Sequence, residues 1–580
     1  MANFTKKVFG LAGAAVVFAG MAFGQATCAS SATTNIIRAE GTTEQVAQLT
    51  IKCSTGATTT ALAGLASLQV FLSPALPVTS KVLSTTSGAT EAVAVVLDAT
   101  NTPVAQTAPT YSSGTQLSAT VSGSTINFSG LVIPVLANSQ SFTITISNVR
   151  VNATSLSVGS GVPPAISETA FISGSAGSIV PAALASTQVA FAQNGLGTSS
   201  LFKTWTTVAT VAGAASGFPN GTGTTAGANN FVICNAYSPR INAVNLATNP
   251  AAATTVVAGS SMAFAVRVNE NFASAFKSIA GESSTVVNGT NAVTNGTRFQ
   301  VNFANVPNGV SLFVPNGVLT STNGSAATAQ LTSSAAGTAL APVTGSTSAS
   351  ITTSTGLTSG GASSLAPVAL SSGAGSAVFE IIVQDPNNLD RFDIPVFVVT
   401  TANSVPGSAT ALTASVSLSP TGSTVIPNFA VGGSTTTLTA SAFNICSTSL
   451  LFPFVTNQLG FDTGIAIANT STDPFGAAGA TAQAGTCSLN FYGAGAPSPA
   501  NVTTPNVPTG TVYTQVLSGV AAGFQGYIIA QCNFQYAHGF AFITDGVGVN
   551  GGLSQGYLAG VIPDVNQVNR QTGTGESLAN

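Results

Sequence analysis

Apolar and polar residues alternate over short stretches along most of the chain, at the two-residue period of a half-buried β-strand. Ser141–Ser147 is the clearest case, and Leu49–Cys53, Phe264–Val268 and Phe299–Phe303 follow the same pattern. Gly, Pro and Asn interrupt these runs at short intervals, as they do in compact antiparallel β-domains. The pattern predicts an all-β, multi-domain protein of antiparallel β-sandwiches, with at most one or two short helices.

One stretch departs from the two-residue period. Phe272, Phe276 and Ile279 recur at helical spacing, and either Asn269 or Asn271 precedes them as a candidate N-cap. We therefore expect one short helix at this place.

Changes in composition divide the 580-residue chain into modules long enough to bury a core each. The expected order is a secretion signal peptide at 1–26, β-sandwich module 1 at 27–200, a Gly/Ser/Thr-rich linker or surface loop at 201–230, module 2 at 231–447, module 3 at 448–563 and a polar tail at 564–580. Module 2 contains a low-complexity tract at 321–375. The tract could form thin strands and long loops or be partly disordered, and its lack of charge favours ordered loops.

The first residues have the pattern of a secretion signal. Lys6 and Lys7 form a positive region, Val8–Phe23 is apolar, and small residues offer a cleavage site before Gln25. A retained membrane anchor is the alternative to cleavage. No later stretch is long and apolar enough to span a bilayer. We expect a secreted protein, located in the extracellular space or on the outer cell surface.

The chain has very little charge. Only 5% of its residues are charged, and the formal net charge is −3. No basic patch is available to neutralise phosphates, so nucleic-acid binding is excluded as a function. Residues 299–379 and 394–461 contain no charge at all, although 44% of the chain is hydrophobic. Such surfaces depend on hydroxyl and amide groups for solubility, which is typical of packed or assembled extracellular proteins.

Six cysteines in an exported chain indicate three structural disulfides. The expected bridges are Cys28–Cys53, Cys234–Cys446 and Cys487–Cys532. Cys53, Cys487 and Cys532 each lie on the apolar face of an expected strand. The second bridge would join the two ends of module 2, and its alternative pairs each of these cysteines with one in a terminal module. No CxxC spacing is present, so the pattern does not indicate zinc.

Two glycine-rich motifs near the end of the chain suggest enzymes but lack the necessary context. Gly552–Gly556 fits a nucleophile elbow, but that motif needs a strand, a turn and a helix, with the histidine after the serine. His538 is the only histidine and precedes the motif. Gly546–Gly551 fits a dinucleotide fingerprint, yet the following glycines disfavour the helix it requires. We expect no catalytic residue and no cofactor, with His538 as a hydrogen-bonded strand residue.

One acidic cluster is a candidate calcium site. Asp385, Asp390 and Asp393 lie near a single expected turn, where their carboxylates would bind Ca²⁺ together with backbone carbonyls. The alternative is a solvated turn in which Asp385 caps the chain before Pro386, and we favour this alternative.

Three segments carry a resemblance to a family. Arg38–Glu44, Phe272–Lys277 and the block from Phe452 to Phe542 resemble uncharacterised large secreted β-rich proteins of soil bacteria. The last block is also similar to small β-sandwich domains repeated in bacterial cell-surface proteins. The resemblance implies export, β-architecture and residence at the cell surface. It supplies no catalytic residue.

These observations favour a non-enzymatic structural or adhesive protein of the cell surface or extracellular matrix, acting through uncharged β-sheet surfaces. Its expected partners are other copies of itself, as a homo-oligomer or larger assembly, or components of the cell surface and matrix. A glycan-binding surface protein is the alternative, and a glycoside-active enzyme is a more distant one. The candidate stacking aromatics for glycans are Trp205, Tyr492, Tyr513, Tyr527 and Tyr536. For Trp205, packing of the linker onto a neighbour is the competing interpretation.

Overall fold

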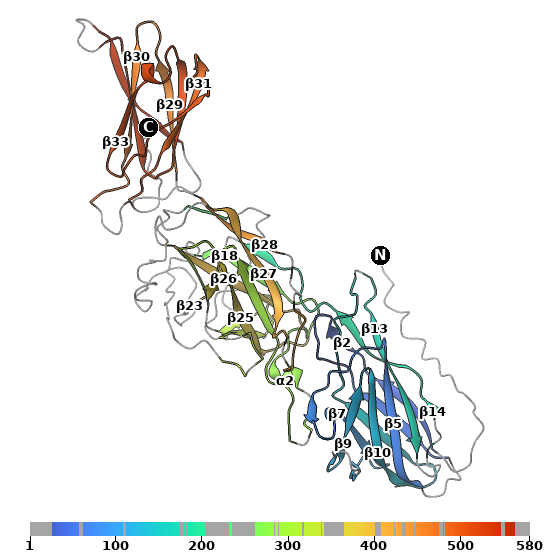
Figure 1. The fold of residues 1–580 in the computed structure, drawn as a ribbon. Helices are drawn as coiled ribbons and strands as arrows, with labels where there is room; N and C mark the ends of the chain where they lie inside the picture. Colours follow the sequence, from blue (N-terminus) through green and yellow to red (C-terminus); the bar gives the residue numbers. More distant parts are fainter. Residues whose placement is uncertain are drawn as a thin grey trace. The chain divides into compact units, whose positions relative to one another are not determined.

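The computed structural model describes residues 26–562, except 57–61, 108–111, 160, 175–178, 180–181, 203–230, 235–261, 284, 288, 316–317, 334, 338, 342–364, 401–407, 423, 432–434, 436, 445–446, 475–479, 481 and 547–551. The regular secondary structure of the described residues is almost entirely β-strand (Figure 1). None of the described helices is long and apolar enough to cross a membrane. The chain forms two compact units. Unit 1 comprises Met1–Gly195, Glu282–Thr294 and Thr424–Ala430, and unit 2 comprises the remaining segments.

A 13-stranded sheet makes up most of unit 1. Its main path runs through β1 (Thr27–Ala32), β4 (Leu49–Ser54), β11 (Ser141–Ser147), β7 (Ala89–Leu97), β9 (Gln116–Ser122), β10 (Thr125–Leu136), β5 (Leu62–Ser73), β13 (Ala165–Gly174), β15 (Thr187–Gln193) and β2 (Asn35–Arg38). The short strands β6 (Val82–Ser84), β8 (Ser112–Ser113) and β14 (Ala182–Ala183) pair beside it, and β3 (Glu44–Gln45) pairs with β12 (Arg150–Val151). All neighbours are antiparallel except β15 and β2.

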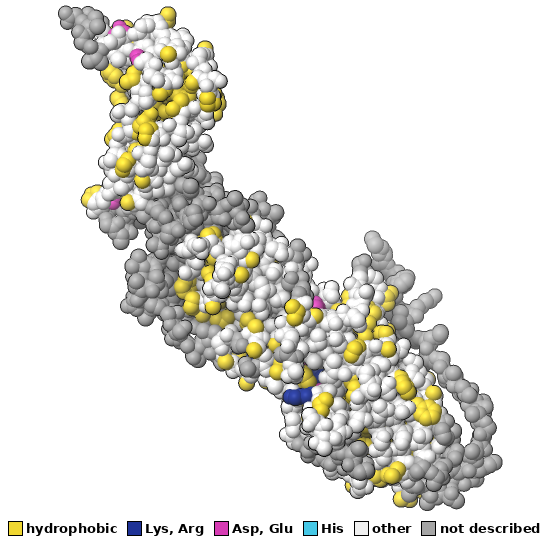
Figure 2. Space-filling view, in the orientation of Figure 1, with side chains coloured by type: hydrophobic (Ala, Val, Ile, Leu, Met, Phe, Trp, Pro, Cys, Tyr) yellow, Lys and Arg dark blue, Asp and Glu magenta, His cyan; other side chains and the backbone are white. Residues whose placement is uncertain are grey.

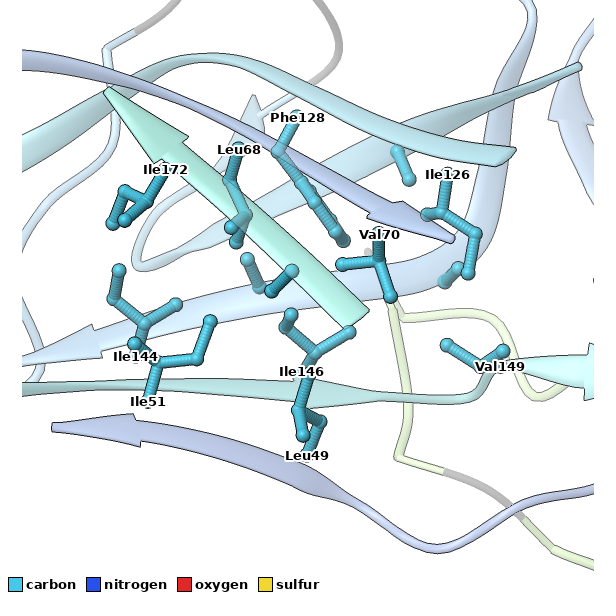
Figure 3. Close-up of a cluster of buried hydrophobic side chains, with 14 of the residues drawn as sticks. Leu49, Ile51, Leu68, Val70, Ile126, Phe128, Ile144, Ile146, Val149 and Ile172 are labelled. Carbon is cyan, nitrogen blue, oxygen red and sulfur yellow. The ribbon is translucent and has the colours of Figure 1, made fainter. Parts of the chain in front are cut away.

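The core of unit 1 lies between two parts of this long sheet. Apolar residues of β4 and β11 point toward those of β5, β10 and β13 (Figure 3). Ser30 on β1 donates a hydrogen bond to the carbonyl oxygen of Ala185, next to β15, over 3.0 Å. The sheet therefore folds over into two layers around one hydrophobic core, as the alternation of apolar residues requires.

Two segments from much later in the chain complete unit 1. The side chain of Asn148 bonds both the amide and the carbonyl of Thr285, over 2.9 and 2.7 Å. The amide of Asn428 donates to Thr43 Oγ1 over 2.9 Å, and Phe429 forms a β-bridge with Gly41. Unit 1 is therefore built from three separate pieces of chain.

Residues 200–444 of unit 2 form two sheets. The five-stranded sheet has the order β16 (Ser200–Phe202), β18 (Met262–Asn269), β26 (Arg391–Thr400), β20 (Val310–Pro315) and β23 (Leu365–Pro367). The eight-stranded sheet has the order β17 (Phe231–Cys234), β28 (Leu438–Asn444), β27 (Ser408–Ser419), β19 (Arg298–Ala304), β25 (Ala374–Val383), β22 (Thr328–Thr332) and β21 (Val318–Thr320), with β24 (Leu370–Ser371) beside β25. Phe299 of the second sheet stacks on Phe392 of the first at 5.4 Å, so the two sheets face each other.

The helix predicted over Phe272–Ile279 is wrong. This segment is a turn with Ser274 at a φ of 70°, and the only α-helix among the described residues is α2 (Ile279–Glu282). Phe276 is buried, as the apolar spacing indicated. Its backbone amide, however, donates a hydrogen bond to the carboxylate of Glu270 over 2.7 Å. A buried side chain thus takes the amide that a helix would have used.

Residues 448–562 form what we call the C-terminal sandwich. Its five-stranded sheet has the order β32 (Asn501–Thr503), β31 (Cys487–Ala494), β34 (Gln525–Cys532), β29 (Thr448–Thr456) and β37 (Gly560–Ile562). Its four-stranded sheet has the order β33 (Val512–Val516), β30 (Asp462–Asn469), β35 (Ala537–Thr544) and β36 (Ser554–Leu558). Apolar residues of both sheets share one core.

The two inner faces of the C-terminal sandwich differ in side-chain size. Phe452 on β29 is fully buried, and a Cβ added to Gly539 on β35 would lie 2.7 Å from its Cζ. Opposite Phe452, strand β35 therefore turns the small residues Gly539 and Ala541 inward. The alternation of the strand then forces Phe540 and Phe542 outward, where they are 42% and 37% exposed.

Two of the three predicted disulfides are confirmed. Cys28–Cys53 joins β1 to β4, and Cys487–Cys532 joins β31 to β34, each between directly paired residues. Cys446 lies outside the described residues, so the Cys234–Cys446 bridge stays a prediction.

Other sequence-based expectations also fall on undescribed parts of the chain. The signal peptide up to residue 25, nearly all of the 201–230 segment and the polar tail lie outside the described residues. The low-complexity tract is described at 321–341 and 365–375, apart from residues 334 and 338, and contributes β22, β23 and β24. The division into three modules stays a prediction.

We predict that Gly539→Ala destabilises the C-terminal sandwich by about 1–3 kcal/mol, because the new methyl group would overlap Phe452 and Ala559. Gly464→Ala on the neighbouring strand β30 is the matched control, since the nearest atom to its Cβ would be 3.9 Å away. Urea unfolding followed by hydrogen exchange of C-terminal peptides measures both. Equal stability of the two variants would contradict this account of the core.

Candidate functional site

Half of the charged side chains in the described part of the chain are buried. Eleven are buried: Arg38, Glu44, Glu91, Arg150, Glu168, Glu270, Glu282, Arg298, Glu380, Asp390 and Asp393. Only Lys52 and Asp545 are exposed among the described charged residues, and the others are partly buried. Figure 2 accordingly shows a surface with few basic or acidic atoms. We therefore consider the uncharged sheet faces as the candidate functional site.

Arg38 is at the centre of the largest buried ion-pair cluster, in unit 1. Its guanidinium lies 2.7 Å from carboxylate oxygens of both Glu44 and Glu282, and 4.8 Å from the centre of the Phe429 ring. Burial alone would lower the pKa of Arg38, but the two carboxylates more than offset this and hold it above its usual value. The cluster joins strand residues of unit 1 to both of its late segments.

The remaining buried arginines also have partners inside the protein. Arg150 lies 3.2 Å from Glu91 and donates to the carbonyl oxygen of Glu282 over 3.1 Å. Arg298 pairs with Glu380 across β19 and β25 at 2.7 Å. Such pairs avoid uncompensated buried charge, and they leave the surface without it.

The three carboxylates of the candidate calcium cluster have other hydrogen-bond partners. Asp393 forms two hydrogen bonds with Arg267, over 2.7 and 2.9 Å, and Asp385 accepts from the amide of Asn387. Asp390 accepts a hydrogen bond from the hydroxyl of Ser325. No group of three metal-ligating side chains occurs among the residues that the structure describes. The favoured alternative, an Asp385 turn, fits the observed hydrogen bonds.

The glycine-rich motifs are not in an enzymatic context either. Ser554 opens strand β36 and pairs with Thr544, so it is not on a strand-to-helix turn. Thr544 and His538 are six residues apart on β35, which places the serine and the histidine roughly 20 Å apart. A nucleophile and its base need hydrogen-bond distance. Residues 547–551 of the second motif lie outside the described structure.

A polar face covers the outer side of β1, β4 and β11 in unit 1. We call it the hydroxyl face because Ser and Thr occupy most of its outward positions. Two rows of directly paired residues surround Lys52: Ser31–Thr50–Thr145 and Thr27–Ser54–Ser141. This face offers neutral hydrogen-bonding groups at strand spacing, about 4.8 Å between neighbours.

The five candidate stacking aromatics divide into three groups. Tyr492 on β31 and Tyr527 on β34 are directly paired, 45% and 41% exposed, with ring centres 4.9 Å apart. Tyr536 is buried and Tyr513 packs against the core, so neither offers a free ring face. Trp205 lies outside the described residues. The structure thus brings together one pair.

An apolar groove on the four-stranded sheet of the C-terminal sandwich was not expected from the sequence. The β30 groove, as we call it, has a volume of about 470 Å³ and is lined by Gly464, Ile465, Ala466, Thr514, Gln515, Val516, Phe540 and Phe542. Hydrophobic side chains also gather on the visible side of this sandwich in Figure 2. The available signal was the alternation Phe540–Ala541–Phe542, which puts both rings on one face but does not say which face is outside.

Comparisons with known proteins give no family. No family model matches the sequence, and no curated protein matches it. Solved structures similar to the chain include a partial N-terminal region of an enterococcal surface protein, at 7% identity and a TM-score of 0.17 over 73% of this chain and 95% of that one. The major pilin subunit of Bacillus cereus is 8% identical, with a TM-score of 0.20 over 80% of this chain and 87% of that one. The pilus backbone protein of Streptococcus pneumoniae is 8% identical, with a TM-score of 0.17 over 92% of this chain and 94% of that one. TM-scores this low do not indicate a shared function.

We predict that Glu282→Gln lowers the free energy of unfolding of unit 1 by about 3 kcal/mol, because it removes one carboxylate from the buried Arg38 cluster. Asp98→Asn is the control, since Asp98 is a partly exposed turn residue outside this cluster and accepts a hydrogen bond from the amide of Thr100. Thermal unfolding of the full chain, with hydrogen exchange of unit 1 peptides, measures the difference. If the free energy of unfolding falls no more than in the control, the ion pair between Arg38 and Glu282 does not stabilise unit 1.

Glu168 on β13 is buried, and neither of its carboxylate oxygens has a hydrogen-bond partner among the described residues. Burial raises the pKa of this carboxyl to about 8. The folded state therefore keeps a proton that the unfolded state loses near pH 4.5. Between these two pH values the folded state binds more protons, so stability falls as the pH rises.

We predict that Glu168→Gln removes this loss, which amounts to about 1.4 kcal/mol for each pH unit. The variant and the natural chain should be similarly stable near pH 4.5 and should diverge increasingly toward pH 8. Urea unfolding across this pH range measures the difference between them. Parallel curves would mean that Glu168 is ionised inside the folded protein.

Proposed function

We propose that this is a secreted, non-enzymatic structural or adhesive protein of the cell surface or extracellular matrix. Its uncharged β-sheet faces make cohesive contacts with like chains or with matrix components. The observation that carries the proposal is the near absence of exposed charge: Lys52 and Asp545 are the only exposed charged residues in the described part of the chain.

Physical chemistry connects this surface with cohesion. Exposed charge normally keeps proteins apart through like-charge repulsion, and charged residues such as Lys guard sheet edges against pairing with other chains. This chain buries half of its described charged side chains and fully exposes only Lys52 and Asp545, so the repulsion is largely missing. The hydroxyl face and the β30 groove supply neutral hydrogen-bonding and apolar contacts in its place.

The disulfides support the proposed location. Cys28–Cys53 ties the first strand of unit 1 to its neighbour, and Cys487–Cys532 ties two strands of the C-terminal sandwich. Such bridges persist in oxidising compartments and are rare in the cytosol. They favour an extracellular protein that must keep its sheets intact without chaperones.

A second candidate function is neutral-glycan binding, favoured by one observation. Tyr492 and Tyr527 are stacked on each other and exposed on the outer face of the five-stranded sheet. Asn490 and Asn501 are directly paired beside them and carry amide groups suited to sugar hydroxyls. The two rings cover each other's inner faces, however, which leaves little flat aromatic surface for a sugar.

We predict that attachment to cells, and self-association, are nearly unchanged from about 0.01 M to about 1 M salt, although this shortens the Debye length from about 30 Å to about 3 Å. Neutral hydrogen bonds and apolar packing are not screened. The measurement is retention of labelled mature protein on cells, together with sedimentation of the protein alone, at each salt concentration.

The matched variant is Thr50→Lys with Thr145→Lys, which places two charges beside Lys52 on the hydroxyl face. If this face makes contacts, the variant should attach less well at low salt and recover at high salt. A natural chain that neither attaches nor associates would refute the proposal. Saturable binding to one neutral polysaccharide, lost in Tyr492→Ala, would move the assignment to the second candidate.

A further inference from the structure

The β30 groove lies beside a ridge of exposed apolar side chains on the same sheet face. Phe540 and Phe542 point outward from β35, and Leu558 is 57% exposed on β36, directly paired with Phe540. On the other side, β30 contributes the small residues Gly464 and Ala466 to the floor of the groove, so the surface steps down from ridge to groove. The ridge and the groove are therefore neighbours on one face.

The ridge is held in place before any partner arrives. A Cβ added to Gly556 on β36 would lie 2.5 Å from Cζ of Phe540, so this ring lies over the glycine. Aromatic side chains that cover a cross-strand glycine are a known means of stabilising sheet edges. A ring already fixed by its own sheet loses little conformational entropy when a second surface packs on it.

The cross-strand register makes this face complementary to itself. Phe540 is paired with Ala466, and Phe542 is paired with Gly464. A two-fold axis parallel to the strands, above the boundary between β35 and β30, would exchange the two strands between copies. It would set the partner's Phe540 over Ala466 and the partner's Phe542 over Gly464. Each ridge would then fill the other copy's groove, as an isologous interface requires.

We propose that the outer face of the four-stranded sheet is a self-association surface, and that its occupant is the same face of a second copy of this chain. The inference rests on the proposed function, of which it names the contact and the partner. No charged side chain lines the groove, so two copies meet there without charge repulsion.

The exposed area points to a weak dimer. An aromatic side chain has roughly 200 Å² of surface, so the two rings, 42% and 37% exposed, offer about 150 Å². With Val516 and Leu558 the apolar patch reaches a few hundred Å², less than the approximately 800 Å² per partner in stable complexes. Weak contacts of this kind become effective when chains are held close together on a surface.

The test is sedimentation equilibrium of the full mature chain over a wide concentration range. Ala466→Glu puts a charge on the floor of the groove, and Phe542→Thr removes half of the aromatic ridge. Both positions face solvent in the single chain, so folding should be retained and is checked by thermal unfolding. Gln531→Glu adds the same charge to the outer face of the opposite sheet and is the matched control.

The expected result is a dimer for the natural chain and for Gln531→Glu, with the dissociation constant raised at least tenfold in both groove variants. Equal association of all four proteins would overturn the inference and leave the proposed function standing on other faces. A monomeric natural chain that still attaches to cells would do the same. A chain ending at Ile562 that dimerises more tightly than the natural one would overturn it too, because the chain's own tail would then cover the groove. Loss of both association and attachment would refute inference and function together.

Discussion

The constraint on which the rest of this structure depends is the burial of charge in neutralised pairs. A buried arginine is tolerated only when carboxylates and carbonyl oxygens surround it. Arg38 and Arg150 meet this condition with groups from β3, β7 and the late segment that begins at Glu282. The ion pairs thus do two things at once: they connect distant parts of unit 1, and they remove charge from its surface.

The surface that remains is suited to contact with other neutral surfaces. The hydroxyl face of unit 1 carries hydrogen-bonding groups in register, whereas the C-terminal sandwich carries an apolar ridge and groove. The difference arises in the interior. Phe452 occupies the space opposite Gly539, so β35 has no room for its own phenylalanines inside. Filling the core from one sheet therefore creates an apolar exterior on the other.

Much of the fold followed from local pattern. The alternation in Ser141–Ser147 and Leu49–Cys53 correctly indicated strands with one buried face, and it placed Cys53 inward, where its disulfide now lies. The helix predicted at Phe272 failed because its apolar spacing was real but its amides had other partners. Glu270 captured the amide of Phe276, and Thr297 captured that of Lys277. Spacing alone contains no information about such partners.

The sequence by itself determined the β-class, the scarcity of charge and the cysteine pairs on neighbouring strands, because each depends on composition or on residues close along the chain. The tertiary structure decided which face of a strand is inside: Ala541 and not Phe540 in β35. It also decided which distant segments meet, as Arg38 and Glu282 do. The physical reason is the same in both cases. A two-residue period is identical for either face, and long-range partners are selected only by the shape and charge of the assembled core.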